Sequence, residues 1–524
     1  SLHDALPILS TGWDKNRKVY MEFGIDYNRT FGLHKTTALI LYNQSKYYSP
    51  SLQYYVPNAY QGLVGRLTYE YASRYLAEFN MGYNGTENFA KGKRFGFFPA
   101  VSLGWVISEE KFFPKNNIVK YLKVRGSYGE VGNDQIGGDR FLYLPSSYGA
   151  ASDSGVNKYN FGLASNPYTS LMIVENKIGN PDLTWEKAKK MNVGVDINLF
   201  NNCLTASFDI FKEKRNNILA NRSTSPMIIG ANLPAYNFGE MENRGWEMDL
   251  NFRHHIQDFH YWARFNYSFA RNEIIYMDEV QKRYDYQMTT GRRKNQFFGL
   301  IFDGYYNSWE EINALDRPKS SWSGNQLQPG DVKYVDVNQD GVIDDYDMVP
   351  IGYTPVPEII YGFSFGAQYK GFDFSILFQG ADNVSIKYFG RSMWPFAKGE
   401  ESAKSLIKER WTQERSEAGE KITFPRLSLN PNGETDHNYR PSTLWIRDAS
   451  YLRLKNLEVG YTFTGGFVKR LNLNSVRLYF NGSNLFTWTD VVDLDPEAPS
   501  RSGNVEINTY PLQKVYNIGL NINF

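Results

Sequence analysis

The feature that most limits how this chain can fold is a two-residue alternation of apolar and polar side chains. From 18 to 30, for example, Val19, Met21, Phe23 and Ile25 alternate with polar or small residues. Successive side chains of a β-strand point to opposite faces, so such a segment predicts a strand with one apolar and one polar face. Fifteen strands are expected, at 18–30, 35–46, 61–72, 75–83, 94–106, 120–131, 190–200, 203–216, 244–253, 260–272, 358–370, 372–380, 450–464, 475–487 and 513–524.

A soluble β-sandwich also alternates, but three features favour a transmembrane barrel. Many segments reach about ten residues, which is long enough to cross a bilayer. The apolar faces are rich in Tyr, Phe and Trp, which make up 16% of the chain, as in the aromatic girdles of barrels. The other faces carry charged, amide and glycine residues that suit a water-filled lumen. We therefore predict an all-β fold: a transmembrane antiparallel β-barrel.

The connections between the predicted strands alternate in length. Short turns are expected around 31–34, 73–74, 201–202 and 254–258 and at Gly371, where a positive φ is easily adopted. Mid-length turns at 109–119 and 465–474 fall in the same phase. The intervening connections include long ones, at 47–60, 132–187, 217–243, 273–357, 381–449 and 488–512. Short periplasmic turns and long extracellular loops are typical of outer-membrane barrels. The last strand alternates up to a terminal Phe524, which resembles the signal for barrel assembly.

Composition excludes several function classes. The 57 Lys+Arg and 56 Asp+Glu give a net charge of +1, so nucleic acid is not an expected partner. No run of about 18 or more apolar residues is present, which argues against membrane-spanning helices. The single cysteine, Cys203, excludes a disulfide framework.

The sequence contains no H-E-x-x-H or P-loop signature, so we expect no enzymatic activity. His254, His255 and His260 cluster at a predicted turn and are expected to be solvated. An outer-membrane hydrolase stays open as a minor alternative.

The two ends of the chain suggest how it is organised. Residues 1–10 match nothing that follows and are expected to be a non-native leader. A barrel whose termini both lie in the periplasm needs an even number of strands, whereas fifteen are predicted. Residues 11–524 are therefore expected to be the C-terminal part of a larger barrel.

Segments that occur in order along the chain resemble one family, the SusC/RagA-like TonB-dependent outer-membrane receptors of Bacteroidota. They are NGTENFAKGKRFGFFPAVSLGWVISEEKFF (84–113), LKVRGSYGEVGND (122–134), GNPDLTWEKAKKMNVGVD (179–196), GEMENRGWEMDLNF (239–252), FFGLIFDGYYNSWEEI (297–312), LQPGDVKYVDVNQDGVIDDYDM (327–348), ASYLRLKNLEVGYTF (449–463) and FNGSNLF (480–486). The resemblance implies a barrel of about 22 strands around an N-terminal plug, of which this chain would supply about fifteen.

The same resemblance implies a function. Members import large nutrients, commonly oligosaccharides and sometimes peptides, into Gram-negative cells through the outer membrane. The TonB complex would act through an N-terminal region that this sequence lacks, and a SusD-like surface lipoprotein would cap the barrel in contact with outer-membrane lipid. Two alternatives stay open: a peptide importer, and a surface binding or adhesion receptor without transport.

The run DVNQDGVIDDYD is the strongest local motif. Calcium takes six to eight oxygen ligands, and a loop of this spacing gathers them around one point. Gly341 permits the sharp turn, although Asp replaces the usual Glu at the last position. The expected calcium ligands are Asp336, Asn338, Asp340, the carbonyl of Val342, Asp344 and Asp347.

Aromatic residues in the long loops are candidate ligand contacts, because sugar rings stack on Tyr and Trp. In the first long loop these are Tyr47, Tyr48, Tyr54 and Tyr55. Further along the chain the candidates are Trp322, Tyr388, Trp394 and Phe396. Loop packing is the alternative role for each of them.

Overall fold

The structure of the 524-residue chain is a computed structural model. It describes residues 15–52, 55–135, 140–145, 149–150, 158–163, 168–171, 173–174, 178–224, 233–322, 327–388, 395, 405–428, 436–492, 494–497 and 512–524. The predicted leader, residues 1–10, lies outside the described residues.

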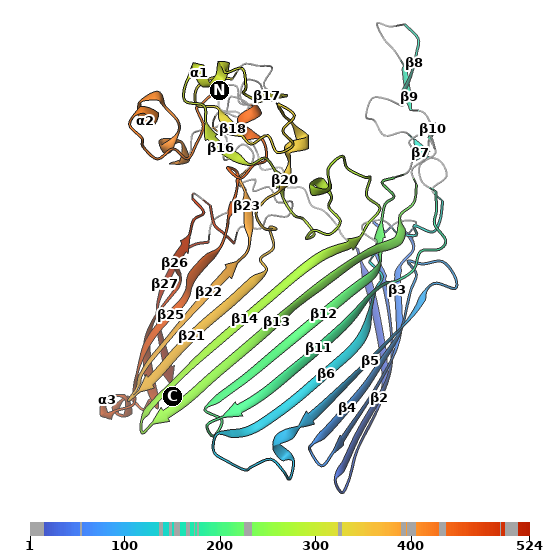
Figure 1. Ribbon diagram of the computed structural model, residues 1–524. Helices are drawn as coiled ribbons and strands as arrows, with labels where there is room; N and C mark the ends of the chain where they lie inside the picture. The colour runs from blue at the N-terminus through green and yellow to red at the C-terminus, as the bar shows by residue number, and fades with distance from the viewer. Residues whose placement is uncertain are drawn as a thin grey trace, which may run out of the picture. The chain divides into compact units, whose positions relative to one another are not determined.

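Fifteen long strands form one sheet in which neighbouring strands in the order are hydrogen-bonded (Figure 1). The order along the sheet is β1-β2-β3-β4-β5-β6-β11-β12-β13-β14-β21-β22-β25-β26-β27. Their bounds are β1 Arg17–Phe31, β2 His34–Tyr48, β3 Asn58–Tyr71, β4 Tyr75–Thr86, β5 Phe95–Val106, β6 Val119–Asn133, β11 Glu186–Leu199, β12 Leu204–Ala220, β13 Tyr236–Ile256, β14 Phe259–Tyr276, β21 Ile359–Tyr369, β22 Phe372–Asp382, β25 Tyr451–Phe463, β26 Ser475–Thr489 and β27 Val515–Asn523. Each of the fifteen predicted segments is confirmed as a strand of this sheet.

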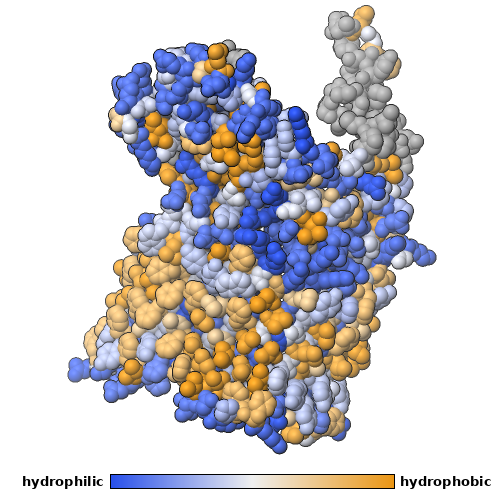
Figure 2. All heavy atoms as spheres, viewed as in Figure 1, coloured by the Kyte–Doolittle hydropathy of each residue, from blue (hydrophilic) through white to orange (hydrophobic). Residues whose placement is uncertain are grey.

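The strand register aligns the two kinds of side chain on opposite faces. Phe23, Tyr42, Leu63, Tyr83 and Phe97 are successive cross-strand partners from β1 to β5. All five are exposed, so this row forms an apolar outer face. One residue along, partners such as Glu22 and Asn43 or Gly62 and Asn84 make the opposite face polar. Figure 2 shows apolar side chains gathered over the long strands.

Strands β12 and β13 are among those that extend beyond their predicted ends. β12 reaches Ala220 and β13 begins at Tyr236, which makes β13 21 residues long, more than a bilayer requires. The added parts are stabilised by charge pairs: the Lys212 and Lys214 ammonium groups each lie 2.9 Å from the carboxylates of Glu242 and Glu240, respectively. Polar residues therefore occupy both faces there, and the apolar signal disappears although the strand continues.

The turn at Gly371 confirms the hairpin predicted there. Its φ is +88°, and a Cβ at this position would lie 2.6 Å from the carbonyl oxygen of Thr462. Only glycine fits this backbone without strain. Neighbouring strands are antiparallel, so successive connections lie alternately at the two ends of the strands. The long loops therefore lie at one end of the strands that they join, and the short turns lie at the other.

Shorter elements lie in the connections between these strands, most of them in the long ones. The short strands are β7 Gly149–Ala150, β8 Lys158–Phe161, β9 Tyr168–Leu171, β10 Ile173–Val174, β15 Phe298–Gly299, β16 Phe302–Tyr305, β17 Lys319–Ser320, β18 Val332–Tyr334, β19 Val342–Ile343, β20 Val349–Pro350, β23 Ser385–Lys387 and β24 Ile446–Asp448. The α-helices are α1 Trp309–Asn313, α2 Gln413–Glu417 and α3 Gly466–Arg470. Within the described residues, no helix has the length and apolar character needed to cross a membrane.

The chain divides into two compact units. The first comprises 1–110, 125–192 and 213–240, and the second comprises 111–124, 193–212 and 241–524. The largest buried core belongs to the second unit and lies in its loops, where Leu300, Val332, Tyr388, Phe424 and Trp445 are each at most 1% exposed. We call the described residues of 277–358, 383–450 and 490–497 the loop lobe. These long loops therefore have a hydrophobic core of their own.

Candidate functional site

A pocket of about 500 Å³ lies in the first unit, at the loop ends of its strands. We call it the rim pocket. Two tyrosines, several amides and hydroxyls, two carboxylates and one guanidinium surround it. The lining residues are Ser45, Tyr47, Asn58, Ala59, Tyr60, Thr86, Glu87, Asn88, Asp134, Gln135 and Arg140.

The strand register explains which side chains meet in the rim pocket. Tyr47 of β2 is the direct partner of Asn58 in β3, and Ser45 is the partner of Tyr60. Tyr60 in turn pairs with Thr86 at the end of β4. These residues have the parity of the polar row, so they lie on the face opposite to the apolar outer face. The pocket therefore opens on the polar face of the sheet.

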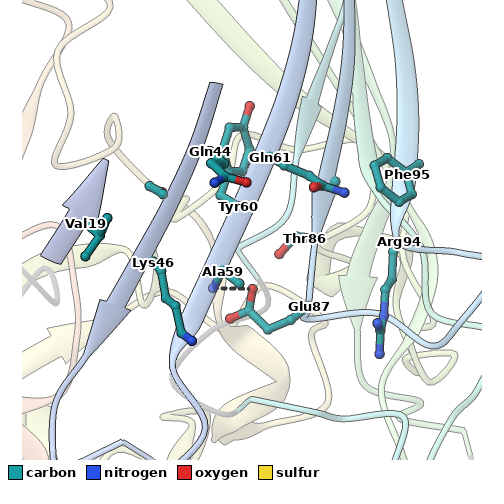
Figure 3. A pocket seen from close by; sticks show the side chains of 12 residues that line it. Val19, Gln44, Lys46, Ala59, Tyr60, Gln61, Thr86, Glu87, Arg94 and Phe95 are labelled. Carbon is teal, nitrogen blue, oxygen red and sulfur yellow. Dashed lines mark hydrogen bonds between the residues drawn. The ribbon is translucent and has the colours of Figure 1, made fainter. Parts of the chain in front are cut away.

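An ion pair fixes the shape of the rim pocket. The Arg140 guanidinium lies 2.7 Å from the Glu87 carboxylate, and both side chains are largely buried. Arg140 also donates to the carbonyl oxygens of Val56, at 2.6 Å, and Pro57, at 3.2 Å. The other Glu87 oxygen accepts from the backbone N–H of Ala59 at 2.9 Å (Figure 3). Three chain segments are thus tied together by one charge pair.

A second pocket, of about 430 Å³, involves the outer side of the same strand ends (Figure 3). Gln44 and Gln61 are direct partners there, and the Tyr42 hydroxyl lies 3.1 Å and 3.4 Å from their side-chain oxygens. Phe95 stacks on Tyr83 with ring centroids 5.1 Å apart. This arrangement is an aromatic and amide border to the apolar face.

The DVNQDG motif forms a compact turn in the loop lobe. Asp347 is fully buried, and its two oxygens accept from the backbone N–H groups of Val337, at 2.8 Å, and Asp344, at 2.9 Å. Burial raises the pKa of the Asp347 carboxyl. The Asp336 carboxylate accepts from the N–H groups of Gln339 and Gly341.

The other predicted ligands, Asn338, Asp340, Val342 and Asp344, belong to the same turn, where Asn338 and Asp340 hydrogen-bond to each other. No group of three or more His, Cys, Asp or Glu side chains within the described parts of the chain is arranged to hold a metal.

A polar network crosses the core of the loop lobe around Asp331, which is 1% exposed. Its carboxylate accepts from Arg426 Nε at 2.6 Å, from Asn438 Nδ2 at 2.8 Å and from the Gln328 N–H at 2.8 Å. Residues far apart in sequence are therefore joined through one buried carboxylate.

The neighbouring His437 is also buried, and the identity of its partners fixes its tautomer. Nε2 lies 2.7 Å from the Val332 carbonyl oxygen, which can only accept, so Nε2 carries the proton. Nδ1 then accepts from the Ser320 hydroxyl at 2.7 Å. Burial lowers the pKa of His437 and favours this neutral ring.

The predicted aromatic contacts have different surroundings. Tyr388 is fully buried in the lobe core and its hydroxyl bonds to the backbone of Val492. Trp322 packs against the same core beneath the Arg440 guanidinium, which lies 4.6 Å from its ring centroid. Tyr55 is 71% exposed and lines neither pocket. Tyr54, Trp394 and Phe396 lie outside the described residues.

Sequence reasoning missed most of the rim pocket. Of the aromatic candidates, Tyr47 lines it, whereas Tyr60, Asn58, Asp134 and Arg140 were not singled out. These residues are not separated by any regular interval in the sequence, because they come from three separate connections that the fold brings together. The register of the β2–β3 hairpin was the one available signal, since it places Tyr60 beside Tyr47.

The cysteine and histidines noted in the sequence lie near short turns. Cys203 is a free thiol of intermediate exposure. The rings of His255 and His260 stack with centroids 5.5 Å apart, and His254 contacts Tyr261.

Comparison with protein families gives a match over residues 4–485 to the family described as TonB dependent receptor-like, beta-barrel. The chain belongs to this family. It is therefore a β-barrel protein of the outer membrane, and TonB-dependent receptors are transporters rather than enzymes.

Curated members of the family are similar along most of the chain. TonB-dependent receptor P3 of Formosa agariphila is 29% identical over 479 residues, covering 88% of this chain and 45% of that receptor. TonB-dependent receptor SusC of Bacteroides thetaiotaomicron is 28% identical over 477 residues, covering 90% of this chain and 44% of SusC. The chain thus spans about half the length of these relatives, and their names agree with the SusC/RagA-like resemblance.

Among solved structures, the RagAB peptide transporter has the same fold. The TM-score is 0.73 at 22% sequence identity, and the match covers 97% of this chain and 56% of that chain. The RagAB peptide importer in its closed-closed state matches with a TM-score of 0.72. Both support the strand arrangement of a TonB-dependent receptor barrel.

Proposed function

We propose that this chain forms the barrel wall of an outer-membrane importer of large nutrients, and that its substrates are oligosaccharides. The family match over residues 4–485 carries the transport part of this proposal. The resemblance to SusC/RagA-like receptors, whose members commonly import oligosaccharides, and the tyrosine- and amide-lined rim pocket support a saccharide substrate. Aromatic walls with a few convergent polar groups are typical of ligand pockets.

The importer would work with two protein partners. A SusD-like lipoprotein would dock on the extracellular loops, and the loop lobe, which has its own core, offers it a preformed surface. The TonB complex would act through an N-terminal region. Outer-membrane lipid would surround the apolar row that includes Phe23 and Phe97.

Calcium binding at the DVNQDG turn is part of the proposal. Asp336, Asn338, Asp340, Asp344 and Asp347, with the Val342 carbonyl, would supply the oxygens and rigidify the loop lobe. Carboxylate oxygens accept more than one interaction, so their present bonds to backbone N–H groups leave lone pairs for a cation.

Calcium titration of the EDTA-treated complete gene product tests this part of the proposal. We expect slower hydrogen exchange at 334–348, with a Kd of about 10⁻⁴–10⁻³ M, and loss of the effect in Asp340→Ala. Asp345→Asn, a change in the same turn outside the predicted ligands, is the matched control. Exchange that calcium leaves unchanged would contradict a calcium site.

A peptide importer is the second candidate, because a solved structure of the same fold is titled a peptide transporter. Growth of a strain that lacks the gene separates the two candidates. The strain is grown on neutral oligosaccharides or on oligopeptides as the sole nutrient. We expect it to grow poorly on an oligosaccharide and to grow normally when the constituent monosaccharides are supplied instead. A defect on peptides alone would favour the second candidate. Normal growth with lost surface binding would indicate a receptor without transport.

A further inference from the structure

The charges around the rim pocket do not cancel. Glu87 and Arg140 neutralise each other at 2.7 Å. Asp134 also lines the pocket, and no described basic side chain forms an ion pair with it. Among the described lining residues, two carboxylates thus accompany one guanidinium, which gives the lining a net charge of −1. This excess would repel an acidic ligand and leaves oxygen atoms available to hydroxyl donors.

The two tyrosines of the rim pocket are diagonal neighbours. Tyr47 is paired with Asn58, and Tyr60 lies two residues further along β3 on the same face. Such positions are about 7–8 Å apart, within reach of aromatic side chains. Tyr60 is 37% exposed, so its ring is accessible to a ligand. Together the rings offer a flat apolar surface with hydroxyls at its edge.

We propose that the rim pocket binds one uncharged sugar ring of the substrate and discriminates against acidic sugars. This inference rests on the proposed function, in which the substrate is an oligosaccharide. The C–H face of the ring stacks on Tyr47 or Tyr60. The Asp134 carboxylate accepts hydrogen bonds from two neighbouring sugar hydroxyls, and the amides of Asn58 and Gln135 complete the polar contacts.

The backbone around the pocket argues against a peptide ligand. Peptides commonly bind by adding a strand to an open sheet edge. β2 and β3 are paired over fourteen residue pairs, from His34–Tyr71 to Tyr47–Asn58, and β3 is paired with β4 on its other side. The strand groups at the pocket are therefore used within the sheet. A peptide therefore cannot add to β2 or β3 at the pocket, and recognition by lining side chains suits a polyhydroxylated ring.

Calorimetry tests the inference by measuring how tightly oligosaccharides bind to the complete gene product, purified from outer membranes in detergent. The probes are maltohexaose, cellohexaose and mannohexaose, an oligogalacturonate of equal length, and a neutral hexapeptide. We expect at least one neutral hexasaccharide to bind at least about tenfold more tightly than the oligogalacturonate, a difference equivalent to one charged contact.

Variants locate that binding. Tyr60→Ala and Asp134→Asn should each weaken the neutral hexasaccharide about tenfold, and Asp134→Asn should narrow the gap to the oligogalacturonate. Tyr55→Ala is the matched control. Tyr55 lies in the connection between β2 and β3, is exposed and does not line the pocket. For the unmodified protein, the hexasaccharide should slow hydrogen exchange at 58–60 and 133–135, a readout that needs no variant.

Three results would overturn the inference: no binding of any neutral hexasaccharide, equal or tighter binding of the oligogalacturonate, or unchanged affinity in both pocket variants. The proposed transport function is tested separately by uptake into cells. If Tyr60→Ala and Asp134→Asn still bind the hexasaccharide at full affinity while uptake continues, the pocket assignment fails and the importer stands. If binding follows the expected pattern but no uptake occurs, the transport function fails instead.

Discussion

The loop lobe and the rim pocket both combine tyrosines with charged side chains, but their polar atoms are used differently. In the lobe, Asp331 is 1% exposed and accepts three hydrogen bonds from groups of the same chain. In the rim pocket, the Glu87–Arg140 pair has the same structural role, whereas Asp134 lines open space. Polar groups that bond to one another stabilise a loop, whereas polar groups that line a pocket can bind a ligand.

The difference also concerns aromatic residues. Tyr388 has its hydroxyl bonded to Val492 and its ring in the lobe core, so it contributes to packing. Tyr47 and Tyr60 line a pocket on the wet face. A tyrosine in a long loop is thus a ligand candidate only when the fold leaves its ring accessible, and sequence cannot separate these cases.

Removing the central carboxylate of the lobe should have the largest effect. Asp331→Ala leaves Arg426, whose side chain is 13% exposed, without its partner. Breaking a buried pair in this way costs about 3–5 kcal/mol, which should appear as faster hydrogen exchange throughout the lobe core. Lys421→Ala is the control, because its ion pair with Glu409 is 3.9 Å long and mostly exposed. Equal effects of the two changes would contradict a stabilising network.

Opening the charge pair of the rim pocket should have a smaller and more local effect. Glu87→Ala removes the carboxylate that accepts from Arg140 and from the Ala59 N–H, and we expect a loss of about 1.5–3 kcal/mol in local stability. Hydrogen exchange should accelerate at 56–60 and 140–145, while the lobe stays unchanged. Acceleration in the lobe as well would mean that the two regions are not energetically separate.

Acidification should weaken the loop lobe through His437. The pKa of His437 is lowered by burial, so below the ordinary value of 6.5 the unfolded chain binds a proton that the folded lobe does not. The stability of the lobe should be complete above pH 6.5 and then fall by at most about 1.4 kcal/mol per pH unit. His437→Gln should remove this part of the pH dependence. Equal protection of the lobe at pH 7.5 and 5.5, after correction for the pH dependence of intrinsic amide exchange, would refute the assignment.

The smallest effect is expected at the extended ends of the strands. Lys212→Ala removes an ion pair with Glu242 whose lysine side chain is 54% exposed, and exposed pairs contribute about 0–1 kcal/mol. Thermal unfolding should shift only slightly, and less in high salt. A large, salt-independent shift would show that this pair is a stronger constraint than its exposure suggests.

Most of the sheet could be predicted from sequence, because an outer face in lipid and an inner face in water impose strict alternation. The row from Phe23 to Phe97 carries that signal across the first five strands. The prediction of β13 began eight residues late, since Glu240 and Glu242 occupy outer positions where an apolar residue was expected. Once a strand leaves the bilayer, ion pairs can replace apolar contacts and the pattern disappears.

The candidate site was much less predictable. The rim pocket joins residues from 45–60, 86–88 and 134–140, and these sequence positions have no fixed spacing. The motif at 336–347 was visible because a single turn supplies all its oxygens. Local motifs can be read from one sequence, whereas a site assembled from several connections needs the fold.

Uptake by intact cells tests the central claim most directly. A fluorescent derivative of the neutral oligosaccharide that supports gene-dependent growth is followed in wild-type cells, in cells that lack the gene and in cells that lack TonB. The account predicts accumulation inside wild-type cells only, with surface binding retained without TonB. Accumulation that continues without the gene or without TonB would contradict an energised importer built on this barrel.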